Sequence, residues 1–275
     1  MTKRFDVRVI KLGASTASAA GLPDATLQLF PQAVAVQAVD VRGMRPEEAV
    51  RNGTLSLAGY KSIVHGRAQH SQMPTMGALG LYLSWRSALQ GHGPLLLLEE
   101  DCQLSAGIHK ALRQFEELEL DVGMIGASAH GGRRHRSTAW VFAPDMAFEA
   151  HCVAFSAQAR ERVGAYVNAH AASMQVDALL CELSVSEDLR LGVYADKSAA
   201  WQPHDSSTIQ LPAQHVRVPN DYIAHFPPAS HHMQKQKGSS LSVATAILTL
   251  VLIVMIGISL VYFIFTDGRK KGTTK

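Results

Sequence analysis

Cysteine is scarce in this sequence, and histidine is frequent but scattered. The 275 residues include only three cysteines, Cys102, Cys152 and Cys181, which lie far apart along the chain. This number and spacing fit neither a disulfide framework nor a structural zinc site. We therefore expect the folded part of the chain to occupy a reducing compartment. The 13 histidines occur singly or in loops, not at the spacings of metal sites.

A strong net charge and an amino-terminal apolar run are also missing. Lysine and arginine total 26 against 23 acidic residues, so the formal net charge is only +3 and nucleic acid is not an expected partner. The first residues, Met1 to Val7, lack the apolar stretch of a secretory signal, so we expect no cleavable signal peptide. No internal repeat is present. The length allows one substantial core and an appendage.

Charge is absent from residue 241 to residue 266, where Leu, Ile, Val and Phe dominate. At about 1.5 Å per residue, a helix of this length spans a hydrocarbon core of roughly 30 Å. Tyr262 and Phe263 near one end suit a membrane interface, and a basic tail over 267–275 follows. The pattern predicts a single-pass transmembrane helix over 241–266 that anchors the protein at its carboxyl end.

The orientation of this helix is subject to two opposing signals. The basic tail favours a cytoplasmic carboxyl terminus, and Lys235 and Lys237 on the other flank partly balance it. The missing signal peptide instead favours a head that stays in the cytosol, as in a tail-anchored protein. We give the missing signal peptide more weight, because so short a carboxyl-terminal tail can cross the membrane with little help from translocation machinery. The expected location is a membrane, with a cytosolic head.

Strand-like and helix-like segments alternate from about Val7 to Gln210, which is typical of an α/β domain with a largely parallel sheet. The predicted strands are 7–12, 33–41, 62–64, 95–98, 122–125, 138–142, 151–155 and 191–194. The predicted helices are 46–50, 75–89, 108–118 and 156–170, and Thr75 and Ser156 are expected to cap two of them. Residues 1–210 are therefore expected to form one folded domain.

Regular periodicity stops after this domain. Residues 211–240 contain several prolines and end in a polar run, so they are interpreted as a flexible linker between the head and the membrane. The expected organisation is a domain over 1–210, a linker over 211–240, a transmembrane helix over 241–266 and a basic tail over 267–275.

Four consecutive leucines, Leu95 to Leu98, run directly into Glu99, Glu100 and Asp101. A short apolar run of this kind predicts a strand buried on both faces of a sheet. In open α/β sheets, ligands bind at the carboxyl ends of the strands. Side chains alternate along a strand, so Glu99 and Asp101 should share a side while Glu100 points away. Such a Glu-x-Asp pair suits Mg²⁺ or Mn²⁺, whereas a solvated acidic turn is the alternative interpretation.

The order of several segments resembles glycosyltransferase family 25, the lipooligosaccharide and procollagen galactosyltransferase group. The run from Gly77 to Trp85 and the strand ending Leu98-Glu99-Glu100-Asp101 are similar to that family's glycine-containing helix and its Leu-Glu-Asp-Asp strand. Further matches in the family's order are Asp121 to Gly126, His151 to Ser156, Val176-Asp177, and Gln202 with Ser207-Thr208-Ile209. The resemblance extends over essentially the whole head.

This resemblance implies a GT-A-like nucleotide-sugar-binding domain and a metal-dependent hexosyltransferase that is inverting. The donor would be a UDP-sugar carrying galactose or glucose, and the acceptor a hydroxyl on a glycan, a lipid-linked glycan or a glycoprotein. It further implies that Glu99, Glu100 and Asp101 hold the donor and its Mn²⁺ or Mg²⁺ ion. Ser84, Gln202 and Ser207 are further candidates for donor contacts.

Two more residues carry roles that depend on the resemblance. Asp177 is the candidate general base that deprotonates the acceptor hydroxyl, and a capping residue before an apolar helix is the alternative. His204 is the candidate third metal ligand, and an ordinary surface histidine is the alternative. Gly77 and Gly80 are expected to permit close packing of their helix.

The basic, glycine-containing stretch 130–136 has two interpretations as well. It would either close over an anionic group or form a solvated loop.

The chain departs from the family pattern at three places, one of which is Glu100, where the family has aspartate. Trp85 stands where the family has histidine, and the loop 13–17 lacks the arginines that commonly follow the family's first strand. These departures motivate an alternative function, a catalytically degenerate, membrane-anchored protein that binds a glycan or nucleotide sugar without turnover. A third hypothesis is a membrane-anchored structural protein whose head is a scaffold.

Overall fold

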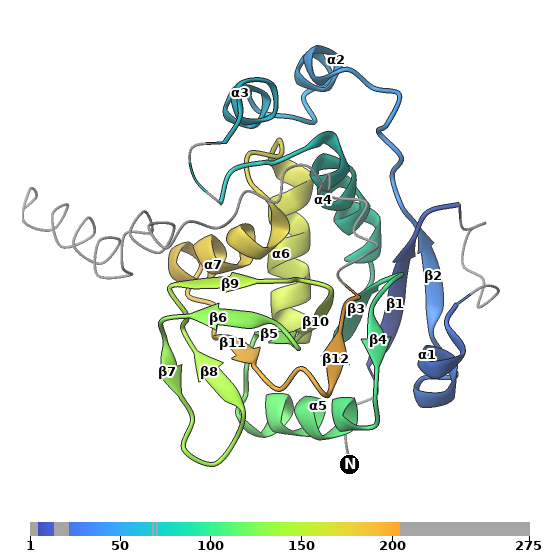
Figure 1. Cartoon of the computed structure of the whole chain (residues 1–275), viewed down its shortest axis with the longest axis vertical. Coiled ribbons are helices and arrows are strands. Elements are labelled where there is room, and N and C mark those ends of the chain that lie inside the picture. Colours follow the sequence, from blue (N-terminus) through green and yellow to red (C-terminus); the bar gives the residue numbers. More distant parts are fainter. Residues whose placement is uncertain (1–4, 14–21, 68, 70, 204–275) are drawn as a thin grey trace, which may run out of the picture. The chain divides into compact units, whose positions relative to one another are not determined.

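A mixed eight-stranded sheet with helices on both faces forms the centre of the fold (Figure 1). The computed structural model describes residues 5–13, 22–67, 69 and 71–203. The strands of the large sheet, in spatial order, are β2 (Val34–Gln37), β1 (Asp6–Lys11), β3 (Leu95–Glu99), β10 (Cys152–Phe155), β5 (Val122–Ile125), β11 (Leu191–Tyr194), β8 (Trp140–Phe142) and β7 (Arg133–Arg134). The prediction of an α/β fold is confirmed.

The strands β2, β1, β3, β5 and β11 run in one direction, whereas β10 and β8 run antiparallel to their neighbours. The largely parallel sheet expected from the sequence is therefore confirmed, with β10 inserted in the opposite direction between β3 and β5. Two small ladders complete the strands, β4 (Gln103–Leu104) with β12 (Ala200–Trp201) and β6 (Ser128–His130) with β9 (Met146–Phe148).

Two hydrophobic clusters, one on each side of the large sheet, make up the core. Leu95 and Leu97 belong to the cluster under α4, α6 and α7, whereas Leu96 and Leu98 belong to the cluster under α5. The leucine strand is thus buried on both faces, as predicted. The helices are α1 (Asp24–Leu29), α2 (Pro46–Arg51), α3 (Leu57–His65), α4 (Met76–Ala88), α5 (Gly107–Glu117), α6 (Ala157–Ala169) and α7 (Val176–Ser186).

The two predicted helix caps are confirmed. The side chain of Thr75 accepts a hydrogen bond from the Ala78 backbone N–H at the start of α4, and Ser156 accepts one from Ala159 at the start of α6. These oxygens satisfy backbone donors that the first helical turn leaves without an intrahelical partner.

The prediction of a strand over 62–64 is wrong, because these residues lie in helix α3. The β-branched pair Ile63 and Val64 favours a strand locally. Ser56 nevertheless caps the helix by accepting a hydrogen bond from Gly59, and the Ser62 hydroxyl bonds to the Gly59 and Met73 carbonyls. Capping and tertiary contacts outweigh the propensity of the two β-branched residues.

No helix among the described residues is both long and apolar enough to cross a membrane. The predicted transmembrane segment 241–266, the linker 211–240 and the tail 267–275 lie outside the described residues. The membrane anchor therefore stays a prediction from the sequence.

A buried arginine joins the end of α4 to the start of the sheet. Arg160 on α6 is fully buried, and its guanidinium forms an ion pair with Asp6 at 2.9 Å. It also donates to backbone carbonyls of the connection between α4 and β3, namely those of Leu89, Gln90, His92 and Gly93. One side chain thus satisfies several carbonyls that the end of the helix leaves open.

We predict that Arg160→Leu lowers the free energy of unfolding by about 3 kcal/mol or more, because the change leaves buried carbonyls without donors. Urea-induced unfolding of the full chain, followed by tryptophan emission, measures the effect. Arg162→Leu is the matched control on the same helix, since Arg162 pairs with Glu187 at the surface, and it should cost less than about 1 kcal/mol. Equal losses in the two variants would contradict the structural role of Arg160.

Candidate functional site

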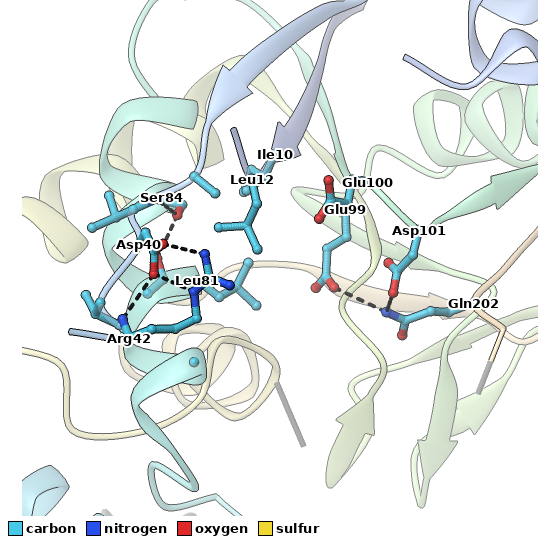
Figure 2. Close-up of a pocket in the computed structure, with 15 residues that line it drawn as sticks. Ile10, Leu12, Asp40, Arg42, Leu81, Ser84, Glu99, Glu100, Asp101 and Gln202 are labelled. Carbon is cyan, nitrogen blue, oxygen red and sulfur yellow. Dashed lines mark hydrogen bonds and ion pairs between the residues drawn. The ribbon is translucent and has the colours of Figure 1, made fainter. Parts of the chain in front are cut away.

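The acidic turn after β3 lies at the carboxyl end of a central strand. Glu99 is the last residue of β3, and the chain turns immediately, with the Cys102 N–H donating to the Glu99 carbonyl at 3.1 Å. The Gln202 side-chain amide donates to Asp101 Oδ2 at 2.7 Å and to Glu99 Oε2 at 3.4 Å (Figure 2). One amide thus joins Glu99 and Asp101, although β3 ends at Glu99 and the turn, not strand alternation, places Asp101 beside it.

These carboxylates are short of positive partners. Asp101 Oδ1 is buried and makes no hydrogen bond among the described residues. Burial, together with the nearby carboxylates of Asp101 and Asp177, raises the pKa of Glu99 to about 8. The Gln202 amide only partly opposes this effect, because it brings no charge. The arrangement stabilises a proton, or a bound cation, between the acids.

Asp177, on α7, lies close enough to Glu99 to raise its pKa. It is the second residue of α7, and its Oδ1 accepts a hydrogen bond from the Ala178 backbone at 2.8 Å. Gln175, not Asp177, is the capping residue, although an acid in the first turn still interacts favourably with the helix dipole. Burial raises the pKa of Asp177 to about 6, whereas the backbone hydrogen bonds and the nearby guanidinium of Arg67 oppose the shift.

A pocket of about 290 Å³ opens beside the acids. Its walls come from the ends of β1 and β2, from α4 and from the turn after β3. The apolar part includes Ile10, Leu12, Val41 and Leu81, and the polar part includes Asp40, Arg42, Ser84, Glu100 and Gln202 (Figure 2). A concave, mostly apolar pocket with a few convergent polar groups is the usual form of a small-molecule site.

The segment that follows β2 forms one rim of this pocket and was not predicted to do so. Arg42 Nη2 lies 2.5 Å from Asp40 Oδ2, and the Arg42 backbone N–H donates to Asp40 Oδ1 at 3.0 Å. These bonds lower the pKa of Asp40 to about 2. Because ligands bind at the carboxyl ends of strands, the position of Asp40 near the carboxyl end of the predicted strand 33–41 was the available signal.

Ser84 and Gly80 hold this rim in place. The Ser84 hydroxyl donates to the Gly80 carbonyl at 2.6 Å and accepts from the Val39 backbone N–H at 2.8 Å. A Cβ added at Gly80 would lie 2.7 Å from the Val39 carbonyl oxygen, so only glycine allows this approach. The expected close packing is confirmed for Gly80. Ser84 lines the pocket as well, but its hydroxyl is already engaged within the fold.

The strand that delivers Gln202 crosses the sheet end at another glycine. Gly126 has a φ of +73°, and a Cβ there would lie 1.9 Å from the Ala200 carbonyl oxygen. The ion pair between Lys197 and Glu149, at 2.8 Å, fixes the segment that leads into β12. Gly126 and this ion pair together explain how a residue so far along the chain reaches the acids on β3.

Several residues near the acids were missed because nothing local distinguishes them. His151 is 2% exposed, and neither ring nitrogen has a hydrogen bond of normal geometry among the described residues. Burial lowers the pKa of its imidazole, and Asp101 and Glu149 oppose this shift. Cys102 and Cys152, far apart in sequence, come together here, and the contact with the Cys152 thiol raises the pKa of Cys102. Tertiary packing alone creates these neighbours.

Two predicted site residues, His204 and Ser207, lie outside the described residues. Within the described part of the chain, no group of three or more His, Cys, Asp or Glu side chains is arranged to hold a metal ion. The described candidates for a cation site are therefore the pair Glu99 and Asp101, with the Gln202 amide between them.

The residue that departs from the family pattern, Trp85, does not line the pocket. It is 1% exposed in the core and meets Phe155 edge to face, with ring centroids 5.7 Å apart. The basic stretch 130–136 forms parts of β6 and β7 with the turns around them. A comparison with protein-family models and a search of curated proteins both find no match to this chain.

We predict that Glu99→Gln stabilises the metal-free protein more at pH 8 than at pH 5. The folded-state pKa of about 8 lies above the ordinary glutamate value of 4.5, so the wild-type protein loses stability as the pH rises through this interval. Glutamine carries no titrating proton and is free of this loss. Urea unfolding of both proteins at the two pH values measures the difference, and an equal difference at pH 5 and pH 8 would contradict the assignment.

Proposed function

We propose that this protein is a metal-dependent glycosyltransferase that moves a hexose, galactose or glucose, from a UDP-sugar to a hydroxyl acceptor. The observation that supports it most is the pair Glu99 and Asp101 at the end of a central strand, beside a pocket open to a small molecule. The sequence resemblance to glycosyltransferase family 25 supplies the reaction class, and the GT-A-like arrangement of the head is part of the same proposal.

The two carboxylates fit a divalent cation. Asp101 has a buried oxygen without a hydrogen bond among the described residues, and Glu99 has a pKa of about 8. A positive ion would bind the Asp101 oxygen and stabilise the charged form of Glu99. Glu99 and Asp101 would hold Mn²⁺ or Mg²⁺, with His204 as the proposed third ligand. When bound, the ion would neutralise charge on the diphosphate leaving group and orient it.

The pocket suits the rest of the donor. Its apolar floor between β1 and α4 gives a surface for a flat base, and Asp40 and Arg42 at the rim offer an acceptor and donors for hydroxyl or ring groups. Glu100, Ser84 and Gln202 line the same space, and Ser207 is carried as a proposed contact. Gln202 would orient Glu99 and Asp101 through its amide.

Asp177 is the proposed general base. A base must be unprotonated at the working pH and within hydrogen-bond reach of the acceptor hydroxyl, and a pKa of about 6 meets the first condition near neutrality. Its carboxylate would take the hydroxyl proton while the sugar is attacked from the face opposite the diphosphate, which gives inversion. Arg67 lies near Asp177 and favours its charged form.

The proposed acceptor is a glycan, glycolipid or glycoprotein at a membrane. If the segment 241–266 anchors the chain as predicted, the head and a membrane-bound acceptor share one surface, which raises their effective concentration. A cytosolic head on a single-pass anchor is part of this proposal.

A second candidate function is a binding protein without turnover. It is favoured by the Gln202 amide, which donates to both carboxylates and so partly satisfies them without a metal ion. The described residues also supply only two acidic ligands. Such a protein would hold a nucleotide sugar or glycan in the same pocket.

The full chain with Mn²⁺ and UDP-galactose or UDP-glucose should release UDP. Changing both Glu99 and Asp101 to alanine should lower this rate roughly 1,000-fold, because the charge that stabilises the leaving group is lost. Glu117→Ala, an exposed acid on α5, is the control and should keep the wild-type rate. Donor binding without UDP release by the wild-type chain would favour the binding protein instead.

Asp177→Asn should lower kcat by about 100- to 10,000-fold while leaving donor affinity unchanged. In the wild-type protein, kcat/KM should fall as the pH drops below about 6, because the base becomes protonated. Asp24→Asn, at an exposed acid on α1, is the control. A rate that Asp177→Asn leaves unchanged, or a loss confined to donor binding, would show that Asp177 is not the base.

A further inference from the structure

The outer edge of the large sheet carries a cluster of arginines. Strand β7, at the end of the strand order, pairs with β8 through Arg133 opposite Phe142 and Arg134 opposite Val141. Arg133, Arg134 and the following Arg136 are all exposed. Among the described residues none of the three side chains forms a hydrogen bond or ion pair. We call these three residues the β7 arginines.

Other surface arginines behave differently. Arg42, Arg162 and Arg190 each pair with a carboxylate, those of Asp40, Glu187 and Glu119 respectively. The β7 arginines form no such ion pair among the described residues, which leaves their guanidinium groups available to an external anion. Charged residues on an edge strand also prevent aggregation between strands of different molecules. A lysine would serve that role equally well, so it does not explain three arginines, whose guanidinium groups offer several planar N–H donors.

The hairpin that carries the cluster is firmly held. Trp140, at the start of β8, is fully buried and packs against Tyr194 with ring centroids 5.2 Å apart. The His135 N–H donates to the Trp140 carbonyl at 2.8 Å, and the His135 ring meets Phe142 edge to face. The arginines therefore project from a fixed backbone, which lowers the entropy lost when they bind.

The geometry indicates an extended anionic partner. Successive side chains of a strand point to opposite sides, so Arg133 and Arg134 straddle the sheet edge. A single small anion does not reach both guanidinium groups. A surface that carries many phosphates can contact both groups when the edge of the sheet faces it. Guanidinium groups bind phosphate oxygens in a bidentate manner.

We propose that the β7 arginines dock the head on an anionic phospholipid surface. The sequence independently predicts a membrane segment over 241–266 with Arg269, Lys270 and Lys271 beyond it, which would keep the head close to such a surface. Docking would then turn this edge of the sheet toward the bilayer. This proposal does not depend on the glycosyltransferase activity, and either can fail alone.

The test uses the full chain in two kinds of nanodisc. One contains phosphatidylcholine alone, and the other also contains about one-third phosphatidylglycerol, which makes its surface strongly anionic. Hydrogen exchange of the backbone over 131–142 is the readout. The anionic lipid should slow exchange in this hairpin, and high salt should remove the effect because it screens the charges. UDP release measured on the same samples reports on the proposed activity separately.

Two charge-matched variants make the test specific. Arg133→Glu with Arg134→Glu should abolish the lipid-dependent protection, because losing two arginines at about 1 kcal/mol each already lowers surface affinity on the order of 30-fold, and the new negative charges lower it further. Arg51→Glu with Lys61→Glu changes the net charge equally on α2 and α3, at the other end of the fold, and should retain it (Figure 1).

Three outcomes would overturn the proposal. These are equal exchange in neutral and anionic nanodiscs, equal loss in both charge variants, and protection by the soluble polyanion heparin without protection by anionic lipid. The last would assign the β7 arginines to an anionic glycan instead of a bilayer.

Discussion

The repulsion between Glu99 and Asp101 is the constraint around which the site is organised. The apolar side chains of the leucine strand are buried on both faces of the sheet. This burial fixes the position of the strand, and therefore of the acids that follow it at the end of the sheet. The amide of Gln202 reaches both carboxylates but brings no charge. A proton on Glu99 or a cation between the two acids is the remaining way to lower the electrostatic free energy.

The rest of the fold brings distant segments to this point. Arg160 fixes the connection that enters β3, Gly126 lets β12 pass close to the sheet, and the ion pair of Lys197 with Glu149 holds the segment before Gln202. On the other side, Gly80 and Ser84 hold the segment after β2 against α4. The pocket and the acids are thus parts of one supported structure, and the proposed donor would bridge them.

Much of the fold could be predicted because its signals are local. The leucine run, the capping residues Thr75 and Ser156 and the strands at 122–125 and 191–194 follow from burial, capping and periodicity within a few residues. The strand expected over 62–64 was wrong because the prediction followed the local β-branched residues and gave no weight to the helix cap at Ser56, which lies further upstream. The reversed direction of β10 is a property of the pairing between strands, which propensity does not reveal.

The site was predictable in part for the same reason. Glu99 was predicted from its place at the end of the leucine strand, whereas Asp101 lies in the following turn and not on the strand, and Gln202 was selected through the family resemblance. His151 comes into the site only through tertiary packing, whereas Asp40 was indicated by its place near the carboxyl end of a predicted strand. Cys102 and Cys152 show the same limit, because they are 50 positions apart but in contact.

The most direct test of the central claim counts the protons released when Mn²⁺ binds. Calorimetric titration of Mn²⁺ into the full chain at pH 7, repeated in buffers with different ionisation enthalpies, gives this number. A Glu99 pKa of about 8 predicts release of about 0.9 proton per ion in the wild-type chain, and close to none in a Glu99→Gln variant that still binds metal. Binding without proton release, or the absence of Mn²⁺ binding, would contradict the account.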